Sequence, residues 1–233
     1  LSKFFKYQDY NDHIKKDSFQ NTIFGLLFFE PSTRTSMSFE SAIHRLGGKI
    51  IKYNKDFSSE KKGESLEDTI KTIDSYIDIF IIRHPEKNII SKIKQYTKKP
   101  IINAGDGSGE HPTQALLDLF TIFDEKNQLP NYISFTGDIK NSRTIHSLVY
   151  LLSKLDKNIE FHFVSDIKLQ PDEEFLTFLQ NIDNKYFLHS SIKNVIQDTD
   201  VLYVTRMQKE RFNNDSSLNH INNIIINNFG INF

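Results

Sequence analysis

Short apolar runs alternate with segments of helical periodicity along this chain, and this alternation limits the fold more than any other feature. The apolar runs are expected to form strands and cover residues 23–29, 49–53, 77–82, 101–104, 132–137, 159–164, 186–188 and 201–205. The segments between them are expected to form helices and cover residues 35–46, 65–75, 88–95, 112–124, 143–155, 173–180 and 192–197. Nearly continuous apolar strands separated by helices are typical of parallel sheets covered on both faces. The sequence therefore predicts an α/β fold built on doubly wound parallel sheets.

A polar stretch near the middle of the chain, residues 124–131 (DEKNQLPN), is the best candidate for a linker. A chain of 233 residues forms one large domain or two small ones, at about 150 residues per domain. We therefore expect two α/β domains, covering residues 1–125 and 126–233.

Composition excludes several classes of function. The formal net charge is −1, so no excess positive charge exists to bind nucleic acid or an anionic membrane non-specifically. The chain has no cysteine, which excludes disulfides and thiolate metal sites. Its apolar runs are shorter than the ~20 residues of a membrane helix, and its first ten residues show no signal-peptide pattern. We expect a soluble, cytoplasmic protein without nucleic-acid or membrane partners; an organellar targeting segment would precede Leu1.

The sequence EPSTRT at residues 30–35 follows an apolar run and opens a predicted helix. A strand-to-helix turn presents unpaired backbone N–H groups at the positive end of the helix dipole, which suits a phosphate group. The hydroxyls of Ser32, Thr33 and Thr35 and the guanidinium of Arg34 add donors. An ordinary Ser/Thr helix cap is the alternative interpretation, but three hydroxyls and an arginine within four residues favour anion binding.

Arginine is scarce and concentrated near strand ends. Only six of the 29 basic residues are arginine, and Arg83, Arg143 and Arg206 lie at or beyond the ends of predicted strands. Ligands of open α/β sheets bind at the carboxyl ends of strands, and the planar guanidinium matches carboxylate or phosphate. A strand-terminal charge met by solvent is the alternative.

Residues 105–114 (GDGSGEHPTQ) lead from a strand into a helix. The glycines suggest a dinucleotide fingerprint, but Glu110 occupies the third-glycine position, so a nicotinamide-dependent dehydrogenase is a weak alternative. His111 and Gln114 stand three residues apart and can grip a carbonyl oxygen and an amide, although a capping histidine is commoner.

The lysine-bearing segment 57–65 (FSSEKKGES) is the type of loop that closes on an anionic ligand, and a solvated charged loop is its alternative. The sequence contains no order of residues typical of a hydrolase, and nothing in it demands a metal.

These motifs resemble, in their order, those of the aspartate/ornithine carbamoyltransferase family. The resemblance runs from about residue 23 to residue 211 and is carried by STRT at 32–35, KKGE at 61–64, RHP at 83–85, HPTQ at 111–114 and TRMQKER at 205–211. Five ordered motifs occurring together are highly specific. Lys62 and the pair Arg206 and Gln208 suit a dicarboxylate and would repel or ignore an ammonium group, so the resemblance favours aspartate over ornithine.

The resemblance implies transfer of the carbamoyl group from carbamoyl phosphate to L-aspartate, an early step of pyrimidine biosynthesis, in a cleft between the two domains. It implies a first domain that binds carbamoyl phosphate through Ser32, Thr33, Arg34, Thr35, Arg83, His111, Gln114 and, from an adjacent subunit, Ser58. It implies a second domain that binds aspartate through Arg143, Arg206, Gln208 and, from an adjacent subunit, Lys62.

The catalytic residues implied are Arg34, Thr35, Arg83 and His111. Thr35, Arg83 and His111 would stabilise the oxyanion that develops on the carbonyl oxygen, and Gln114 would accept from the carbamoyl NH2 group. Positioning and charge stabilisation suffice for an activated acyl phosphate, so neither a cofactor nor a metal is expected. The family also implies a homotrimer with shared active sites.

Two departures from the family pattern concern the ends of the chain. Family members continue past the position of Arg211 with a His-Pro-Leu-Pro loop and a long C-terminal helix, and residues 212–233 contain neither. The family's first helix is barely represented before residue 23. The resemblance thus implies a truncated form or part of a longer chain. A non-catalytic homologue that serves as a binding or scaffold subunit stays open as the alternative.

Overall fold

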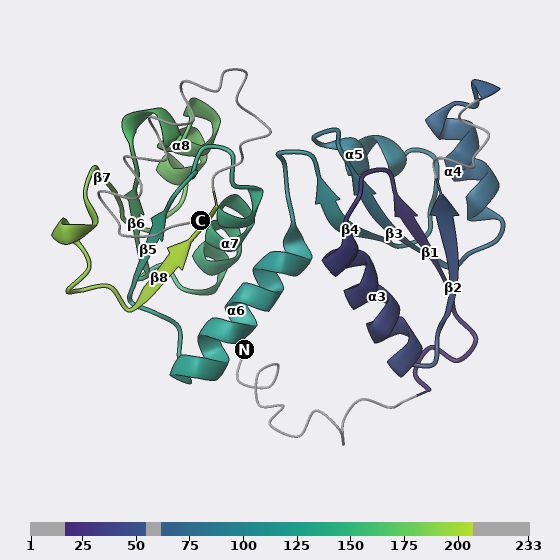
Figure 1. The fold of residues 1–233 in the computed structure, drawn as a ribbon, viewed down its shortest axis with the longest axis horizontal. Coiled ribbons are helices and arrows are strands. Elements are labelled where there is room, and N and C mark those ends of the chain that lie inside the picture. The colour runs from purple at the N-terminus through teal and green to yellow at the C-terminus, as the bar shows by residue number, and fades with distance from the viewer. Residues whose placement is uncertain (1–16, 55–61, 207–233) are drawn as a thin grey trace. The chain divides into compact units, whose positions relative to one another are not determined.

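The computed structural model describes residues 17–54 and 62–206. The chain divides into two compact units between Thr113 and Gln114. In the described residues, each unit contains one four-stranded sheet in which all strand pairs are parallel (Figure 1). The predicted α/β class with two parallel sheets is therefore confirmed. The predicted domain limit between residues 125 and 126 falls in the last turn of α6 (Pro112–Lys126).

The first unit contains a sheet of order β2-β1-β3-β4. Its strands are β1 (Ile23–Phe28), β2 (Lys49–Asn54), β3 (Ile79–His84) and β4 (Ile101–Asp106), and its helices are α3 (Thr33–Arg45), α4 (Leu66–Asp74) and α5 (Ile89–Ile93). Because side chains alternate along a strand, β1 has two apolar faces. Leu26 packs in the cluster that contains Ile43 of α3. Leu27 packs in the cluster that contains Ile70 of α4, together with residues of α5.

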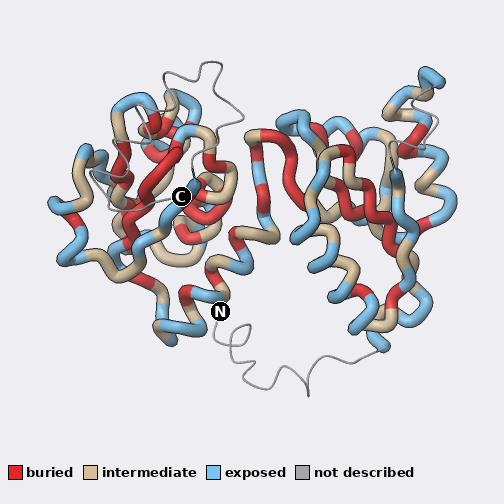
Figure 2. The backbone as a smooth tube through the Cα atoms, in the orientation of Figure 1, coloured by how far each residue is buried: buried red, intermediate tan, exposed pale blue. Residues whose placement is uncertain are grey.

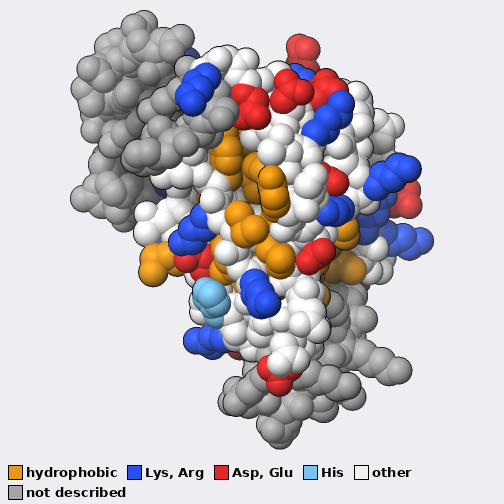
Figure 3. Space-filling model, turned by 90° about the vertical axis from the view of Figure 1, so that its right-hand side faces the viewer, with side chains coloured by type: hydrophobic (Ala, Val, Ile, Leu, Met, Phe, Trp, Pro, Cys, Tyr) orange, Lys and Arg blue, Asp and Glu red, His pale blue; other side chains and the backbone are white. Residues whose placement is uncertain are grey.

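The inner strands of this sheet are buried, whereas its edge is open (Figure 2). The edge strand β2 exposes Ile51, which is 43% accessible, and Tyr76 beyond α4 is 63% accessible. The face of the molecule on this side shows hydrophobic side chains gathered among charged ones (Figure 3). This surface of the first unit therefore exposes apolar side chains, which a strand edge that faces only water usually avoids.

The second unit contains a sheet of order β7-β6-β5-β8. After α6 its elements are β5 (Tyr132–Thr136), α7 (Arg143–Leu155), β6 (Glu160–Val164), a 3-10 turn at Ile167–Leu169, α8 (Glu173–Gln180), β7 (Tyr186–His189), a 3-10 turn at Ile192–Asn194 and β8 (Val201–Val204). Phe175 of α8 packs edge-on against Phe163 of β6 and stacks on His146 of α7. Helices α7 and α8 therefore cover the same face of this sheet.

The predicted helix at residues 192–197 is wrong, because only a 3-10 turn forms there, at Ile192–Asn194. The connection it belongs to reaches the opposite face of the sheet, where Thr199 Oγ1 lies 2.7 Å from Ser134 Oγ. A short turn covers less surface than a helix, and Phe187, Leu202 and Val204 are 42%, 38% and 38% accessible. The other predicted helices and strands are confirmed within a few residues at their ends.

In each sheet the strand order changes direction next to the strand that comes first in the sequence. In the first unit β2 and β3 lie on opposite sides of β1, and in the second unit β6 and β8 lie on opposite sides of β5. Ligands of open α/β sheets bind at the carboxyl ends of strands at such topological switch points. This rule predicts a ligand position between β1 and β3 in the first unit and between β5 and β8 in the second. None of the described helices has the length and apolarity that crossing a bilayer requires.

A histidine pair lies on the thinly covered face of the second sheet. His162 Nδ1 on β6 lies 3.1 Å from His189 Nε2 on β7, and the rings stack at 14°. Burial lowers the pKa of both rings, and the charge of His189 lowers the pKa of His162 further, against Glu160 and Asp198, which raise it. Both rings are therefore held neutral in the folded state more strongly than in the unfolded chain.

This pair is expected to destabilise the fold in mild acid. Because the folded-state pKa values lie below the unfolded value of 6.5, the unfolded chain binds more protons, and stability present above that pH is lost as the pH falls below it. The double variant His162→Gln/His189→Gln should show a flatter decline of the denaturation midpoint between about pH 7 and pH 5. An unchanged slope relative to the parent would contradict this role of the pair.

Candidate active site

The turn between β1 and α3 leaves the start of its helix without a side-chain cap. Ser32 caps α3 with extended backbone, but its side chain makes no capping hydrogen bond, and the first turn of α3 has no acidic residue. Helix α4 differs, because Ser65 Oγ accepts from Asp68 N and the first turn is acidic. The positive end of α3 is thus not neutralised by its own first turn, which favours an external anion. Ser32 and Thr35 are half-buried there, and Thr33 and Arg34 are exposed.

Arg83 lies beside this turn because β3 runs two residues beyond its predicted end. Arg83 pairs with Phe28 in the sheet register, which aligns it with the last residue of β1. Its Nε lies 2.7 Å from Glu30 Oε1, as an ion pair without the alignment of a hydrogen bond. Its Nη1 donates to Ala104 O at 3.3 Å. The guanidinium is therefore held between β1 and β4 with only 12% of the side chain accessible.

His111 completes this group in the first unit. It is buried, and its Nε2 lies 3.5 Å from Arg83 Nη1, while its Nδ1 lies 3.4 Å from Thr113 Oγ1. Because an arginine can only donate, the geometry assigns Nε2 as the acceptor and Nδ1 as the protonated nitrogen. Arg83 and His111 thus lie side by side, and the role on one carbonyl oxygen that the resemblance implies for them stays a prediction.

The loop that carries His111 is fixed by a buried carboxylate. Asp106 Oδ1 accepts from Glu110 N at 2.5 Å, and Asp106 Oδ2 accepts from Asn88 N at 3.2 Å. Gly107 approaches Pro85 so closely that an added Cβ would lie 2.4 Å from the Pro85 carbonyl oxygen, at φ +54°. Only glycine fits such a position without strain. The glycines of this loop therefore serve close backbone approach, and Glu110 replaces the glycine that a dinucleotide site would need.

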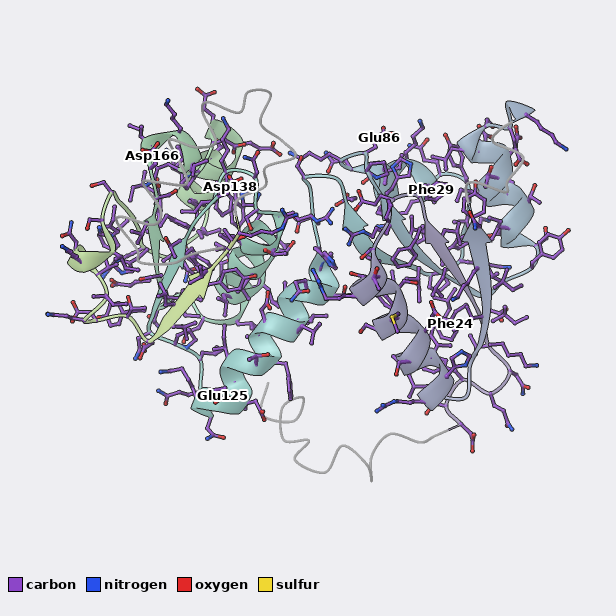
Figure 4. The ribbon with its side chains drawn as sticks, in the orientation of Figure 1. Phe24, Phe29, Glu86, Glu125, Asp138 and Asp166 are labelled. Atoms are coloured by element: carbon purple, nitrogen blue, oxygen red, sulfur yellow. The ribbon has the colours of Figure 1, made fainter. Side chains whose placement is uncertain are left out.

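The second unit has an equivalent turn between β5 and α7. Asp138 is fully buried at the carboxyl end of β5 (Figure 4), and its Oδ1 accepts from Asn141 N at 3.2 Å. Gly137 lies so close to the residue that follows β8 that an added Cβ would be 2.2 Å from Thr205 O. Ser142 Oγ lies 3.2 Å from Thr205 Oγ1. The ends of β5 and β8 are thus joined at the switch point of this sheet.

Two of the predicted aspartate ligands stand at that junction. Arg143 is the first residue of α7, whose first turn has no acidic residue and no side-chain cap. Arg206 follows Thr205 and is exposed. Both arginines therefore flank the only hydroxyl pair described between these two loops, Ser142 and Thr205, and their charges suit a carboxylate.

The remaining predicted residues have different placements. Gln114 belongs to the second unit, where its Nε2 donates to Asp118 Oδ1 at 2.9 Å, whereas His111 belongs to the first. Lys62 is exposed ahead of α4. Ser58 and Gln208 lie outside the described residues. Among the residues that the structure describes, no three His, Asp or Glu side chains are grouped so that they could hold a metal ion.

Glu30 and Asp118 form contacts at the site that the sequence motifs do not indicate. Glu30 adjoins the STRT motif, and its contact with Arg83 spans 53 positions of the chain, so no local pattern marks it. Asp118 stands four residues after Gln114 on a predicted helix, and that spacing places two side chains on one face. The spacing could have indicated the contact between Gln114 and Asp118.

The two open parallel sheets define a two-unit α/β protein. At the switch point of each sheet a helix begins with an arginine in its first turn and without an acidic residue there. Residues 1–124 match the carbamoyl-phosphate-binding domain of aspartate/ornithine carbamoyltransferases, and residues 131–232 match the aspartate/ornithine-binding domain. The chain belongs to the aspartate/ornithine carbamoyltransferase family.

Individual relatives agree with this assignment. The chain is 47% identical over 195 residues to the aspartate carbamoyltransferase catalytic subunit of Methanocaldococcus jannaschii, which covers 83% of this chain and 63% of that protein. It is 44% identical over 197 residues to the multifunctional protein CAD of Squalus acanthias, covering 84% of this chain and 9% of that protein. Its fold is similar to that of Trypanosoma cruzi aspartate transcarbamoylase in complex with N-(phosphonacetyl)-L-aspartic acid, with a TM-score of 0.81, 39% identity, and coverage of 89% of this chain and 66% of that one. The chain thus spans less than two thirds of the length of these two curated relatives.

Proposed function

We propose that this chain is the catalytic part of an aspartate carbamoyltransferase, which converts carbamoyl phosphate and L-aspartate to N-carbamoyl-L-aspartate and phosphate. The observation that carries the proposal is the Arg83–His111 pair beside the uncapped start of α3. It supplies a guanidinium and an imidazole next to a turn suited to phosphate, which is the arrangement an acyl phosphate requires. The named relatives support aspartate as the acceptor.

The first unit acts on carbamoyl phosphate. Backbone N–H groups and hydroxyls of residues 32–35, with Arg34, hold the phosphate, and Thr35, Arg83 and His111 donate to the carbonyl oxygen. The amine of aspartate attacks the carbonyl carbon, the C–N bond forms, and negative charge develops on that oxygen. The C–O bond to phosphate then breaks, and the amine loses a proton as phosphate leaves. His111 donates through the Nδ1 proton or as the imidazolium, so a ring flip or protonation accompanies binding.

The second unit binds aspartate and the carbamoyl amide. Arg143, Arg206 and Gln208 bind the two carboxylates together with Lys62 of an adjacent subunit, and Gln114 accepts from the carbamoyl NH2 group. The cluster of cations repels the side-chain ammonium of ornithine. The active assembly is a homotrimer with shared sites. The hydrophobic surface around Ile51 and Tyr76 in the first unit supports contact with a neighbouring subunit.

The proposal is tested by measuring carbamoylated product in the complete gene product that contains this chain. With carbamoyl phosphate present, we expect product from aspartate at a rate at least ~100-fold above that from ornithine, because the second substrate must neutralise the arginines. Omission of carbamoyl phosphate is the control. Binding of both substrates without any product would contradict catalysis and favour the non-catalytic homologue.

A further inference from the structure

A chain of polar side chains runs through the second unit from α6 to the end of β8. Asp118 lies one helical turn after Gln114, and its Oδ1 accepts from Gln114 Nε2 at 2.9 Å. Its Oδ2 accepts from the hydroxyl of Tyr203 on β8 at 3.0 Å. Each oxygen of the carboxylate therefore has one donor, and the two donors come from separate elements of the unit.

The chain continues from Tyr203 to the start of α7. Thr144 at the start of α7 lies close enough to Tyr203 to lower its pKa, and Thr144 Oγ1 lies 3.1 Å from Ser142 Oγ. Ser142 in turn meets Thr205 at 3.2 Å. The network thus ends at Ser142 and Thr205, which directly precede Arg143 and Arg206 in the sequence. It therefore connects Gln114 with the proposed aspartate site inside one unit.

The carboxylate of Asp118 determines which end of the Gln114 amide faces away from it. An ionised carboxylate only accepts, so the NH2 group of the amide must point at Asp118. The oxygen of Gln114 then points in the other direction, where it can accept from a ligand. Without this partner the two ends of an amide are nearly equal in shape, and either orientation is open to the side chain.

Charge and burial favour Asp118 as the acceptor, with Gln114 and Tyr203 as its donors. Burial raises the pKa of Asp118, but the hydrogen bonds from Gln114 and Tyr203 oppose that rise by favouring the ionised form. Burial also raises the pKa of Tyr203, and the negative charge of Asp118 raises it further. Tyr203 therefore keeps its proton and serves as a donor, which leaves the carboxylate as the acceptor between two donors.

We propose that Asp118 is a positioning residue that turns the side-chain oxygen of Gln114 toward the NH2 group of the bound carbamoyl substrate. Through this orientation Asp118 gives the site its preference for a carbamoyl group over an acyl group without hydrogen-bond donors. The inference rests on the proposed function, because the contact between Gln114 and the carbamoyl NH2 group belongs to it.

The test compares two ligands that differ at this one position. Acetyl phosphate has a methyl group where carbamoyl phosphate has NH2, so it uses the phosphate and oxyanion groups but cannot donate to Gln114. Affinities for both are measured by calorimetry on the complete gene product, without aspartate. The parent is expected to prefer carbamoyl phosphate by about tenfold or more, which corresponds to one well-made hydrogen bond. Asp118→Asn, of nearly the same size, is expected to reduce that preference to about threefold or less.

Three further variants separate positioning from general loss of structure. Gln114→Ala should lose the same preference, and adding Asp118→Asn to it should cause no further loss, because the two act as a unit. Tyr203→Phe keeps the contact between Asp118 and Gln114 and should retain most of the preference. Asp200→Asn is the matched structural control, because Asp200 accepts from the backbone N–H groups of Asn131 and Tyr132 in the same unit. It should leave the ratio of the two affinities unchanged.

The possible results discriminate between this inference and the function on which it rests. A preference that survives in Asp118→Asn, even with both affinities weakened equally, would overturn the positioning role and leave the enzyme activity standing. A parent that forms carbamoylaspartate but does not distinguish the two phosphates would also overturn it. A parent that neither binds carbamoyl phosphate nor forms product would overturn the proposed function together with this inference.

Discussion

Replacement of Arg83 by alanine is expected to lower kcat by ~10²–10³-fold, which corresponds to about 2.7–4 kcal/mol of transition-state stabilisation. Arg83 is held by Glu30, Ala104 O and His111, so its guanidinium is fixed before substrate binds. A preorganised donor needs no reorganisation when charge develops on the carbonyl oxygen, and its removal therefore affects turnover more than binding. The rate of carbamoylaspartate formation at saturating substrates measures this effect.

Two companion variants show whether the loss belongs to the guanidinium. Arg83→Lys retains the positive charge next to Glu30, so it should fold as the parent does. It has no planar guanidinium to reach the same partners, so most of the loss in kcat should remain. Arg45→Ala changes an exposed arginine in the last turn of α3 and should leave kcat within about twofold of the parent. A folded Arg83→Ala protein that turns over within a few-fold of the parent would show that Arg83 does not stabilise the oxyanion.

The sheets could be predicted from sequence because each strand is a continuous apolar run. Phe80, Ile81 and Ile82 are completely or almost completely buried, so no polar alternation was needed to recognise β3. Burial alone does not mark where a strand begins or ends, because Ile77 is equally buried but lies in the connection before β3. For that reason the sequence predicted Arg83 after the strand, whereas it lies within β3 and is aligned with the end of β1.

Side-chain partners at the site could be predicted only where they are close in sequence or share a strand end. The α/β pattern predicts that Ser32 and Arg83 follow or end strands of one sheet, and the family resemblance implied that they serve one ligand. The contact of Tyr203 with Asp118 joins positions 85 residues apart. It depends on how α6 packs beside β8, and no periodicity encodes that. The helix expected at residues 192–197 failed for a related reason, because its apolar positions are too few to bury a helix face.

Mixing two inactive variants should restore activity if Lys62 serves a neighbouring subunit. The sheet order places β2 at the edge, on the far side of β1 from the switch point beside β3. Strand β2 is therefore separated by β1 from β3, which carries Arg83 of the same chain, and Lys62 is exposed ahead of α4. In the proposed homotrimer, an anionic ligand at the switch point of an adjacent chain would give that lysine a partner. Lys62→Ala and Arg83→Ala should then each abolish the sites of their own homotrimers.

The two variant proteins, made as complete gene products, are unfolded together at equal ratio and reassembled. In a cyclic trimer every mixed assembly contains one site with both residues intact, since the site takes Arg83 from one chain and Lys62 from the next. Random mixing makes roughly three quarters of the trimers mixed, and one site in three is active in each, so about a quarter of the parental activity should return. The matched control mixes Arg83→Ala with His111→Ala, whose side chains lie in one unit and meet at 3.5 Å. That mixture should restore nothing, because no intact site can form across subunits. If trimers shown to be mixed by mass spectrometry stay inactive in the first experiment as well, Lys62 acts within its own subunit or outside the site.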